Sequence, residues 1–171
     1  MRGGRVTALA MAVAMLAACH KGGQAPAAQP SATPDLETAA IAAGVIPDPA
    51  NSDLTGLYAR DTDRVCLVPG QLNFRIGAYV DYGPAQSCAG SGSATRSGEL
   101  LHVRFDGADG CEFDARYEGD RIVFPAVVPS GCAKLCHGRA SFAALDVALL
   151  SNSLSEAAAM REGKGRLLCG G

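Results

Sequence analysis

The stretch CAKLCHG, residues 132 to 138, holds two cysteines and a histidine at a spacing that could do chemistry. Its Cys–Cys separation is one residue longer than in the Cys-x-x-Cys-His run that attaches haem covalently. A haem site would use Cys132 and Cys136 for thioethers and His137 for iron, with Met160 or His102 as distal ligand. A zinc site would combine the same three side chains with Cys169. A third alternative makes both cysteines halves of structural disulfides.

The surroundings of CAKLCHG favour disulfides. The stretch resembles the haem motif of c-type cytochromes but departs from it in the cysteine spacing, and it lies between a proline-rich segment and Gly138. Zinc thiolates compete poorly with oxidation in an exported protein. On a helical turn, Cys132 and Cys136 would have Cβ atoms about 5–6 Å apart, beyond the usual disulfide separation of about 3.8 Å. We therefore expect each of them to bridge outward.

The start of the chain predicts export. Arg2 and Arg5 precede an apolar run from Thr7 to Ala18, which is shorter than the roughly 20 residues that span a bilayer. A charged start followed by a short apolar run is typical of a secretory signal peptide.

The junction Leu16-Ala17-Ala18-Cys19 resembles the lipobox of bacterial lipoproteins. The resemblance implies cleavage before Cys19, acylation of Cys19 with diacylglycerol and palmitate, and membrane attachment. The next residue is His20 rather than the aspartate that favours inner-membrane retention, which implies an outer-membrane, periplasm-facing location. An ordinary signal peptide with an incidental cysteine is the alternative.

The remaining cysteines form an even set, which in an oxidising compartment predicts a disulfide framework. Its members are Cys66, Cys88, Cys111, Cys132, Cys136 and Cys169. Cys66 and Cys88 are the candidate local pair, which leaves Cys111 and Cys169 to pair with Cys132 and Cys136. Each bridge would contribute roughly 2–4 kcal/mol.

The amino-acid composition limits the classes of molecule that this protein is expected to bind. The chain has 171 residues, a formal net charge of -2 and 5% aromatic residues without tryptophan. Its arginines and lysines are scattered singly, so we expect no nucleic-acid partner. Membrane contact through lipid at Cys19 and an envelope protein partner remain as expectations.

The chain divides into a signal peptide and three mature segments. Residues 1–18 are the expected signal peptide, and 19–33 form a Gly-, Ala- and Pro-rich tether. Residues 34–53 hold a short helix and linker, in which Leu36 and Ile41 either dock on the domain or fray. Residues 54–171 form the disulfide-bonded domain.

The sequence of that domain predicts a mainly β fold: a small antiparallel barrel or sandwich with one or two short helices. LTGLYAR, RVCLVP, LNFRIGAYVDYG, ELLHVRFDG, CEFDARYEGD and RIVFPAVVP have strand character, with turns at DTD, GSGS, DGADG and EGD. Three inward rows are expected: Leu72, Phe74, Ile76, Ala78 and Val80; Leu101, Val103 and Phe105; Phe113, Ala115 and Tyr117. Pro125 and Pro129 should mark a strand end or an edge strand. Ser153 and Glu156 predict a helix start, and Gly163 its end.

Other polar residues are weaker candidates for a functional site. DGADG, residues 106–110, could bind calcium but has the composition of a β-turn. Glu112 and Asp114 could form a catalytic carboxylate pair, although a solvated charge ladder with Arg104 and Arg116 is the simpler interpretation. A hydrolase using His102 or His137 is a further alternative, and the GSGS serines lack a nucleophile elbow.

Small disulfide-bonded β domains on a lipobox anchor look like the periplasmic lysozyme-inhibitor lipoproteins. Gly56-Leu57-Tyr58 is also similar to the Gly-x-aromatic start of calycin-like barrels. Both resemblances concern architecture alone. The sequence favours a non-enzymatic binding or inhibitor-like module without a cofactor, in which DYGPAQS and GSGSATRSG, as loops, would form the contact surface. A covalent-haem electron carrier and a hydrolase are the alternative functions.

Overall fold

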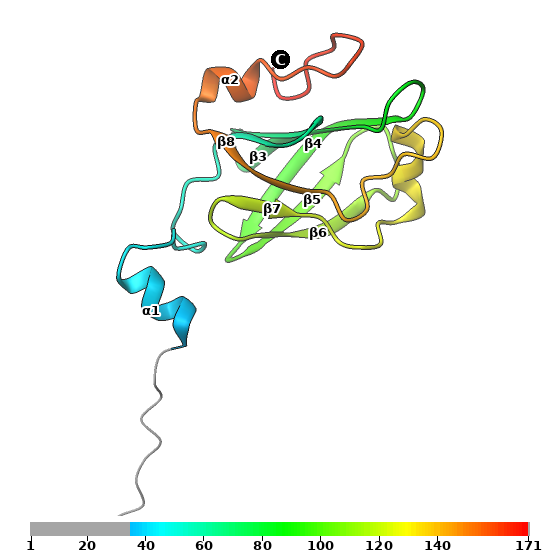
Figure 1. Cartoon of the computed structure of the whole chain (residues 1–171). Helices are drawn as coiled ribbons and strands as arrows, with labels where there is room; N and C mark the ends of the chain where they lie inside the picture. Colours follow the sequence, from blue (N-terminus) through cyan, green and yellow to red (C-terminus); the bar gives the residue numbers. More distant parts are fainter. Residues whose placement is uncertain (1–34, 171) are drawn as a thin grey trace, which may run out of the picture. The chain divides into compact units, whose positions relative to one another are not determined.

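The computed structural model describes residues 35–170. The predicted signal peptide, Cys19 and the tether 19–33 therefore lie outside the described residues. The described part is mainly β (Figure 1). Its elements are α1 (Leu36–Ala42), β1 (Gly56–Arg60), β2 (Asp63–Pro69), β3 (Phe74–Asp81), β4 (Ser87–Ser97), β5 (Leu100–Phe105), β6 (Glu112–Tyr117), β7 (Arg121–Val123), the 3-10 helix η1 (Ser130–Leu135), β8 (Asp146–Ser151) and α2 (Leu154–Ala158).

The eight strands form a closed antiparallel barrel, which confirms the predicted fold class. Each strand pairs with the next one in sequence, and β8 returns to pair with β1. The closing pair has an irregularity between Leu57 and Tyr58. Each strand thus has a neighbouring strand on both sides, although β6 pairs with the short β7 only at Arg116 and Tyr117.

The predicted inward rows account for much of the barrel interior. Val103 and Ala115 are fully buried, while outward neighbours such as His102 and Asp114 are exposed. Leu72 was wrongly assigned to the first row: it is 98% exposed because it lies in the turn before β3 begins at Phe74. Pro125 follows the end of β7 as expected.

Aromatic side chains fill the centre of the barrel. The ring centroids of Phe105 and Phe142 lie 5.1 Å apart, and those of Phe113 and Phe124 lie 4.9 Å apart. An eight-stranded barrel is narrow enough for side chains to fill it. The interior is therefore a core in this protein, and binding surfaces must be sought outside it.

The segment GSGS, residues 90–93, was predicted as a turn but lies within β4. A Cβ at Gly90 would come 2.9 Å from the Phe105 ring, and one at Gly92 would come 2.0 Å from the Arg104 carbonyl oxygen. The glycines let β4 approach β5 and the aromatic core. They give this strand the composition of a turn although it is the longest of the barrel.

The segment before β1 covers one end of the barrel. The Tyr58 hydroxyl donates to the Leu54 carbonyl at 3.0 Å, and the Tyr117 hydroxyl donates to the Asp53 carbonyl at 3.1 Å. Burial raises the pKa of Tyr58 far above its ordinary value, so this phenol stays a neutral donor. Arg96 also donates to backbone carbonyls of this segment.

The helices are short. α1 has no buried residue, and Leu36 is 90% exposed. Ser153 caps α2 by accepting from the Glu156 amide at 3.4 Å. The helix ends at Ala158, before Gly163. Beyond α2, Met160, Leu168 and Cys169 pack in a small second cluster against Cys66 and Val68 of β2.

Candidate functional site

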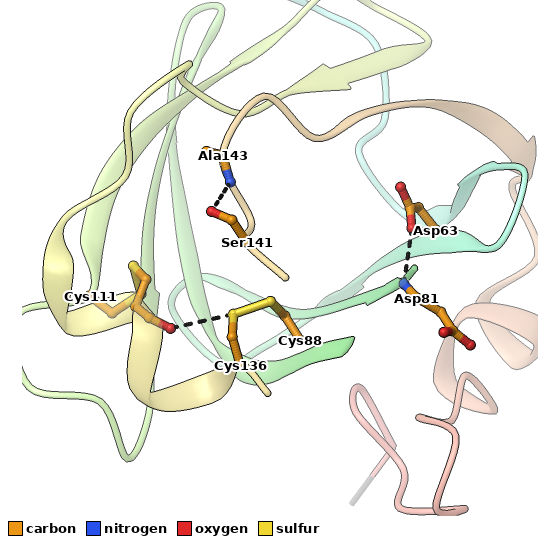
Figure 2. Close-up of a disulfide and its surroundings, with 8 residues drawn as sticks. Asp63, Asp81, Cys88, Cys111, Cys136, Ser141 and Ala143 are labelled. Atoms are coloured by element: carbon orange, nitrogen blue, oxygen red, sulfur yellow. Dashed lines mark hydrogen bonds between the residues drawn. A yellow bond between two sulfur atoms is a disulfide. The ribbon is translucent and has the colours of Figure 1, made fainter. Parts of the chain in front are cut away.

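CAKLCHG is a double disulfide anchor. Cys136 bonds to Cys88, as Figure 2 shows. Cys132 bonds to Cys111, and Cys66 bonds to Cys169. Both cysteines of the stretch bridge outward, as expected. The local pair Cys66–Cys88 was wrong because β2 and β4 are separated by β3, so Cys66 faces the C-terminal segment instead.

The disulfides remove the sulfur atoms that the haem and zinc interpretations require. Cys132, Cys136 and Cys169 are all oxidised, so none is a free thiol for a thioether or a thiolate ligand. The suggested distal ligands also lie in other settings: Met160 is in the second cluster, and His102 faces outward on β5, 2.9 Å from Asp114.

The local structure of this stretch follows from its ends. Pro129 precedes η1, and the helix ends where Cys136 becomes extended. The next amide, that of His137, donates to the Ser87 carbonyl of β4 at 2.8 Å. Backbone and disulfide therefore hold the end of η1 against the start of β4, and Lys134 and His137 remain exposed.

A groove of about 870 Å³ lies beside this anchor. Tyr79, Ser87 and Ala89, from the outward faces of β3 and β4, line it together with the turn Gly83–Ala85. Lys134, Leu135 and His137 contribute from the η1 side, and Glu162, Gly163, Lys164 and Arg166 contribute from the C-terminal loop. The groove thus joins three segments that are distant in sequence.

The C-terminal loop is braced internally. Arg166 Nε and Nη2 lie 3.0 and 3.3 Å from the two carboxylate oxygens of Glu162, and the Glu162 amide donates to the Arg166 carbonyl at 3.0 Å. The loop approaches Tyr79 closely, since a Cβ at Gly163 would come 2.5 Å from the Tyr79 hydroxyl oxygen. Cys66–Cys169 ties the segment after the loop to β2.

The carboxylates of the groove already have donors. Asp81 accepts from the Tyr79 hydroxyl at 3.2 Å and from the Gly83 amide at 2.9 Å, and Glu162 is paired with Arg166. Burial, reinforced by Asp81, raises the pKa of Tyr79, which keeps this phenol protonated as a donor.

The two lysines of the groove, unlike Glu162, have no partner of opposite charge among the described residues. Lys134 and Lys164 make no ion pair with any residue from 35 to 170. The other lysine of the sequence is Lys21. The groove therefore presents two uncommitted ammonium groups to a ligand.

The groove also holds Ser87, His137 and Asp81, the residue types of a hydrolytic triad. In the described part of the chain no side-chain hydrogen bond joins Ser87 to His137, or His137 to a carboxylate. A nucleophile needs a base within hydrogen-bond reach and an orienting group behind it. These three residues are near one another without being connected in that way.

The other predicted polar sites are local structures. Glu112 lies 3.2 Å from Arg104, and Asp114 lies 2.9 Å from His102, as members of a cross-strand charge ladder. DGADG forms a turn in which the Cys111 amide donates to the Ala108 carbonyl at 2.9 Å. Within residues 35–170, no group of three or more His, Cys, Asp or Glu side chains is placed to hold a metal ion.

Sequence reasoning found part of the groove. DYGPAQS, expected as a contact loop, supplies Asp81, Gly83–Ala85 and Ser87. GSGSATRSG is mostly strand, so its expected role as a loop was wrong. The C-terminal loop was missed as a contributor; its one signal was a lysine, Lys164, in a sequence poor in lysine.

Comparison with protein-family models, with curated proteins and with solved structures found no match. None of the helices within residues 35–170 is long and apolar enough to cross a membrane.

Proposed function

We propose that this chain is an envelope lipoprotein whose barrel is a non-enzymatic binding module. In this proposal, lipid on Cys19 holds the mature protein on the periplasmic face of the outer membrane. The barrel then offers its groove to an envelope protein, either as an inhibitor or as an assembly partner.

The groove is the observation that carries the proposal. A pocket of about 870 Å³ is within the size range of built recognition sites, and it lies on a scaffold whose interior is filled. Three disulfides fix the scaffold. Loops held by a rigid scaffold are where proteins concentrate recognition.

The lipid part of the proposal rests on the sequence Leu16-Ala17-Ala18-Cys19 after a short apolar run. Two or more acyl chains hold a protein stably on a bilayer, whereas one chain binds marginally. The cysteine partition is consistent with this assignment, because the six other cysteines all pair within the domain.

Site-specific photo-crosslinking in living cells tests the proposal. A photoreactive amino acid replaces Ala89 in the groove or, as a matched control, Thr95 further along the same outer face of β4. The two positions are about 20 Å apart along the strand. We expect one discrete protein adduct from position 89 and none from position 95.

The outcome that contradicts the proposal is equal labelling from both positions, or no adduct from position 89 or from Leu135. Hydrolytic activity that disappears in His137→Ala while the fold is retained would instead favour an enzyme.

A further inference from the structure

We infer that the groove recognises an acidic peptide segment of its partner, one in which carboxylate side chains flank an apolar side chain. This inference rests on the proposed binding function and adds the chemistry of the ligand. It follows from the distribution of charge, from the apolar part of the groove and from the hydrogen bonds of the backbone beside it.

The distribution of charged side chains in the groove indicates the sign of the charge that the ligand should carry. Glu162 is ion-paired with Arg166, whereas Asp81 accepts only from neutral donors, so the formal charge of Asp81 stands against those of Lys134 and Lys164 and leaves the groove with a net positive charge. Lys134 on the η1 side and Lys164 on the loop side have no carboxylate partner within the described residues. Ammonium groups that remain free on both walls are complementary to a ligand carrying two separated negative charges.

The apolar lining sets the second requirement. Pro84, Ala85, Ala89 and Leu135 contribute apolar side chains to the lining of the groove. A simple phosphate or a sugar acid would leave this apolar surface uncovered. A peptide covers it with one apolar side chain and places neighbouring acidic side chains toward the lysines.

The backbone beside the groove is already engaged. An added strand needs a free edge with unpaired N–H and C=O groups, and the Ser87 and Ser91 carbonyls of β4 accept from the His137 and Asp106 amides. We therefore expect the peptide to be recognised mainly through its side chains. Charge and apolar fit then decide its sequence.

Selection from a random peptide library tests the inference. The library displays peptides with one fixed leucine and random flanks, and the bait is the exported, oxidised protein. We expect the selected pool to be enriched in Asp and Glu on both sides of the leucine. Binding of a selected peptide should weaken about tenfold in Lys134→Gln/Lys164→Gln, since each exposed pair contributes about threefold, and it should weaken further with added salt.

A matched variant controls for net charge. Arg104→Gln/Arg139→Gln removes the same two charges from exposed positions that do not line the groove, and we expect it to bind like the unmodified protein. Enrichment of uncharged or basic peptides, or equal losses in both double variants, would overturn the inference.

Two further outcomes separate the inference from the function on which it rests. A groove-specific adduct in cells without acidic enrichment in the library overturns the peptide chemistry and leaves the binding function standing. Binding of a sulfated dextran that depends on both lysines, with no selected peptide, would likewise overturn it and assign the groove to acidic saccharides.

Discussion

At the scale of single residues, the two glycines of β4 decide whether the wall of the barrel can form. Gly92 lies against the backbone of β5, where an added Cβ would overlap the Arg104 carbonyl oxygen. Gly90 leaves room for the Phe105 ring and for Leu135 of the groove. The core and the groove thus depend on the same missing side chains.

We predict that Gly92→Ala lowers the free energy of unfolding by about 2 kcal/mol, because overpacking a close strand contact forces the backbone apart. Ser93→Ala, on the outward face of the same strand, should change it by less than about 0.5 kcal/mol. Denaturant unfolding measures both variants. Equal stability of the two would show that β4 has room at Gly92.

Asp63 is the residue whose ionisation should affect stability. Burial raises the pKa of its carboxyl above the ordinary value of 3.8, with the charges of Asp61 and Asp81 adding to the effect. Its Oδ1 accepts a hydrogen bond from the Asp81 amide at 3.2 Å (Figure 2). The folded protein therefore holds this proton over a pH range in which the unfolded chain has released it.

We predict that Asp63→Asn removes a loss of stability with rising pH. The contribution from Asp63 is fully present below pH 3.8 and is lost as pH rises through its raised pKa. An Asn side chain retains the oxygen acceptor without the charge, so the variant should match or slightly exceed the unmodified protein at pH 7. Unfolding curves from pH 3 to 7 measure this, and parallel pH profiles would contradict it.

At the scale of elements, η1 is the segment whose position depends most on covalent bonds. Its short 3-10 turn has one buried side chain, that of Cys132, and two disulfides join it to β4 and to the start of β6. Because Lys134 and Leu135 line the groove from this segment, the disulfides also hold these two residues of the binding surface in place.

We predict that Cys88→Ala/Cys136→Ala lowers the free energy of unfolding by about 2–4 kcal/mol and speeds hydrogen exchange at the His137 amide, which is bonded to Ser87. The remaining Cys111–Cys132 bond should keep the protein folded. As a control, Cys66→Ala/Cys169→Ala should destabilise without selectively affecting that amide. The same exchange rate at His137 in both variants would contradict a local role for Cys88–Cys136.

The strands show what the sequence can reveal. Alternation located β5 and β6 because their outward faces are charged and their inward faces are apolar. The same pattern failed in β4, where two of the inward positions are Gly90 and Gly92. The pairing of the cysteines also could not be predicted from the sequence. It depends on how β8 closes the barrel and on where the C-terminal segment then lies.

Only part of the groove could be predicted from the sequence, for a related reason. DYGPAQS and CAKLCHG were recognisable as loops or turns with polar groups, but nothing in the sequence says that the loop around Lys164 faces them. That juxtaposition arises from the Cys66–Cys169 bond and from the packing of Leu168 on β2 and β3. Long-range packing therefore created the site.

At the scale of the whole molecule, the cysteines divide between folding and attachment. The six paired cysteines hold the barrel, η1 and the C-terminal segment together. Cys19 is then the residue proposed to carry lipid. The chemical state of these sulfur atoms would differ between haem attachment, thiolate metal binding and lipid anchoring. An experiment that determines this state therefore distinguishes the three roles.

We predict that Cys19→Ala abolishes metabolic labelling with an alkyne analogue of palmitate and shifts the protein out of the outer-membrane fraction, because no acyl chain would remain to hold it. The domain itself should keep its thermal unfolding midpoint. A variant that stays on the membrane would contradict attachment through Cys19.

The most direct test is the intact mass of the mature protein isolated from an envelope able to mature c-type haem, before and after reduction. We predict a chain that begins at an acylated Cys19 and gains six hydrogens on reduction, one for each sulfur of the three disulfides. A haem that survives denaturation, cysteines that gain no hydrogen, or an unmodified residue at the start of the mature chain would contradict the assignment of this protein as a disulfide-stapled lipoprotein.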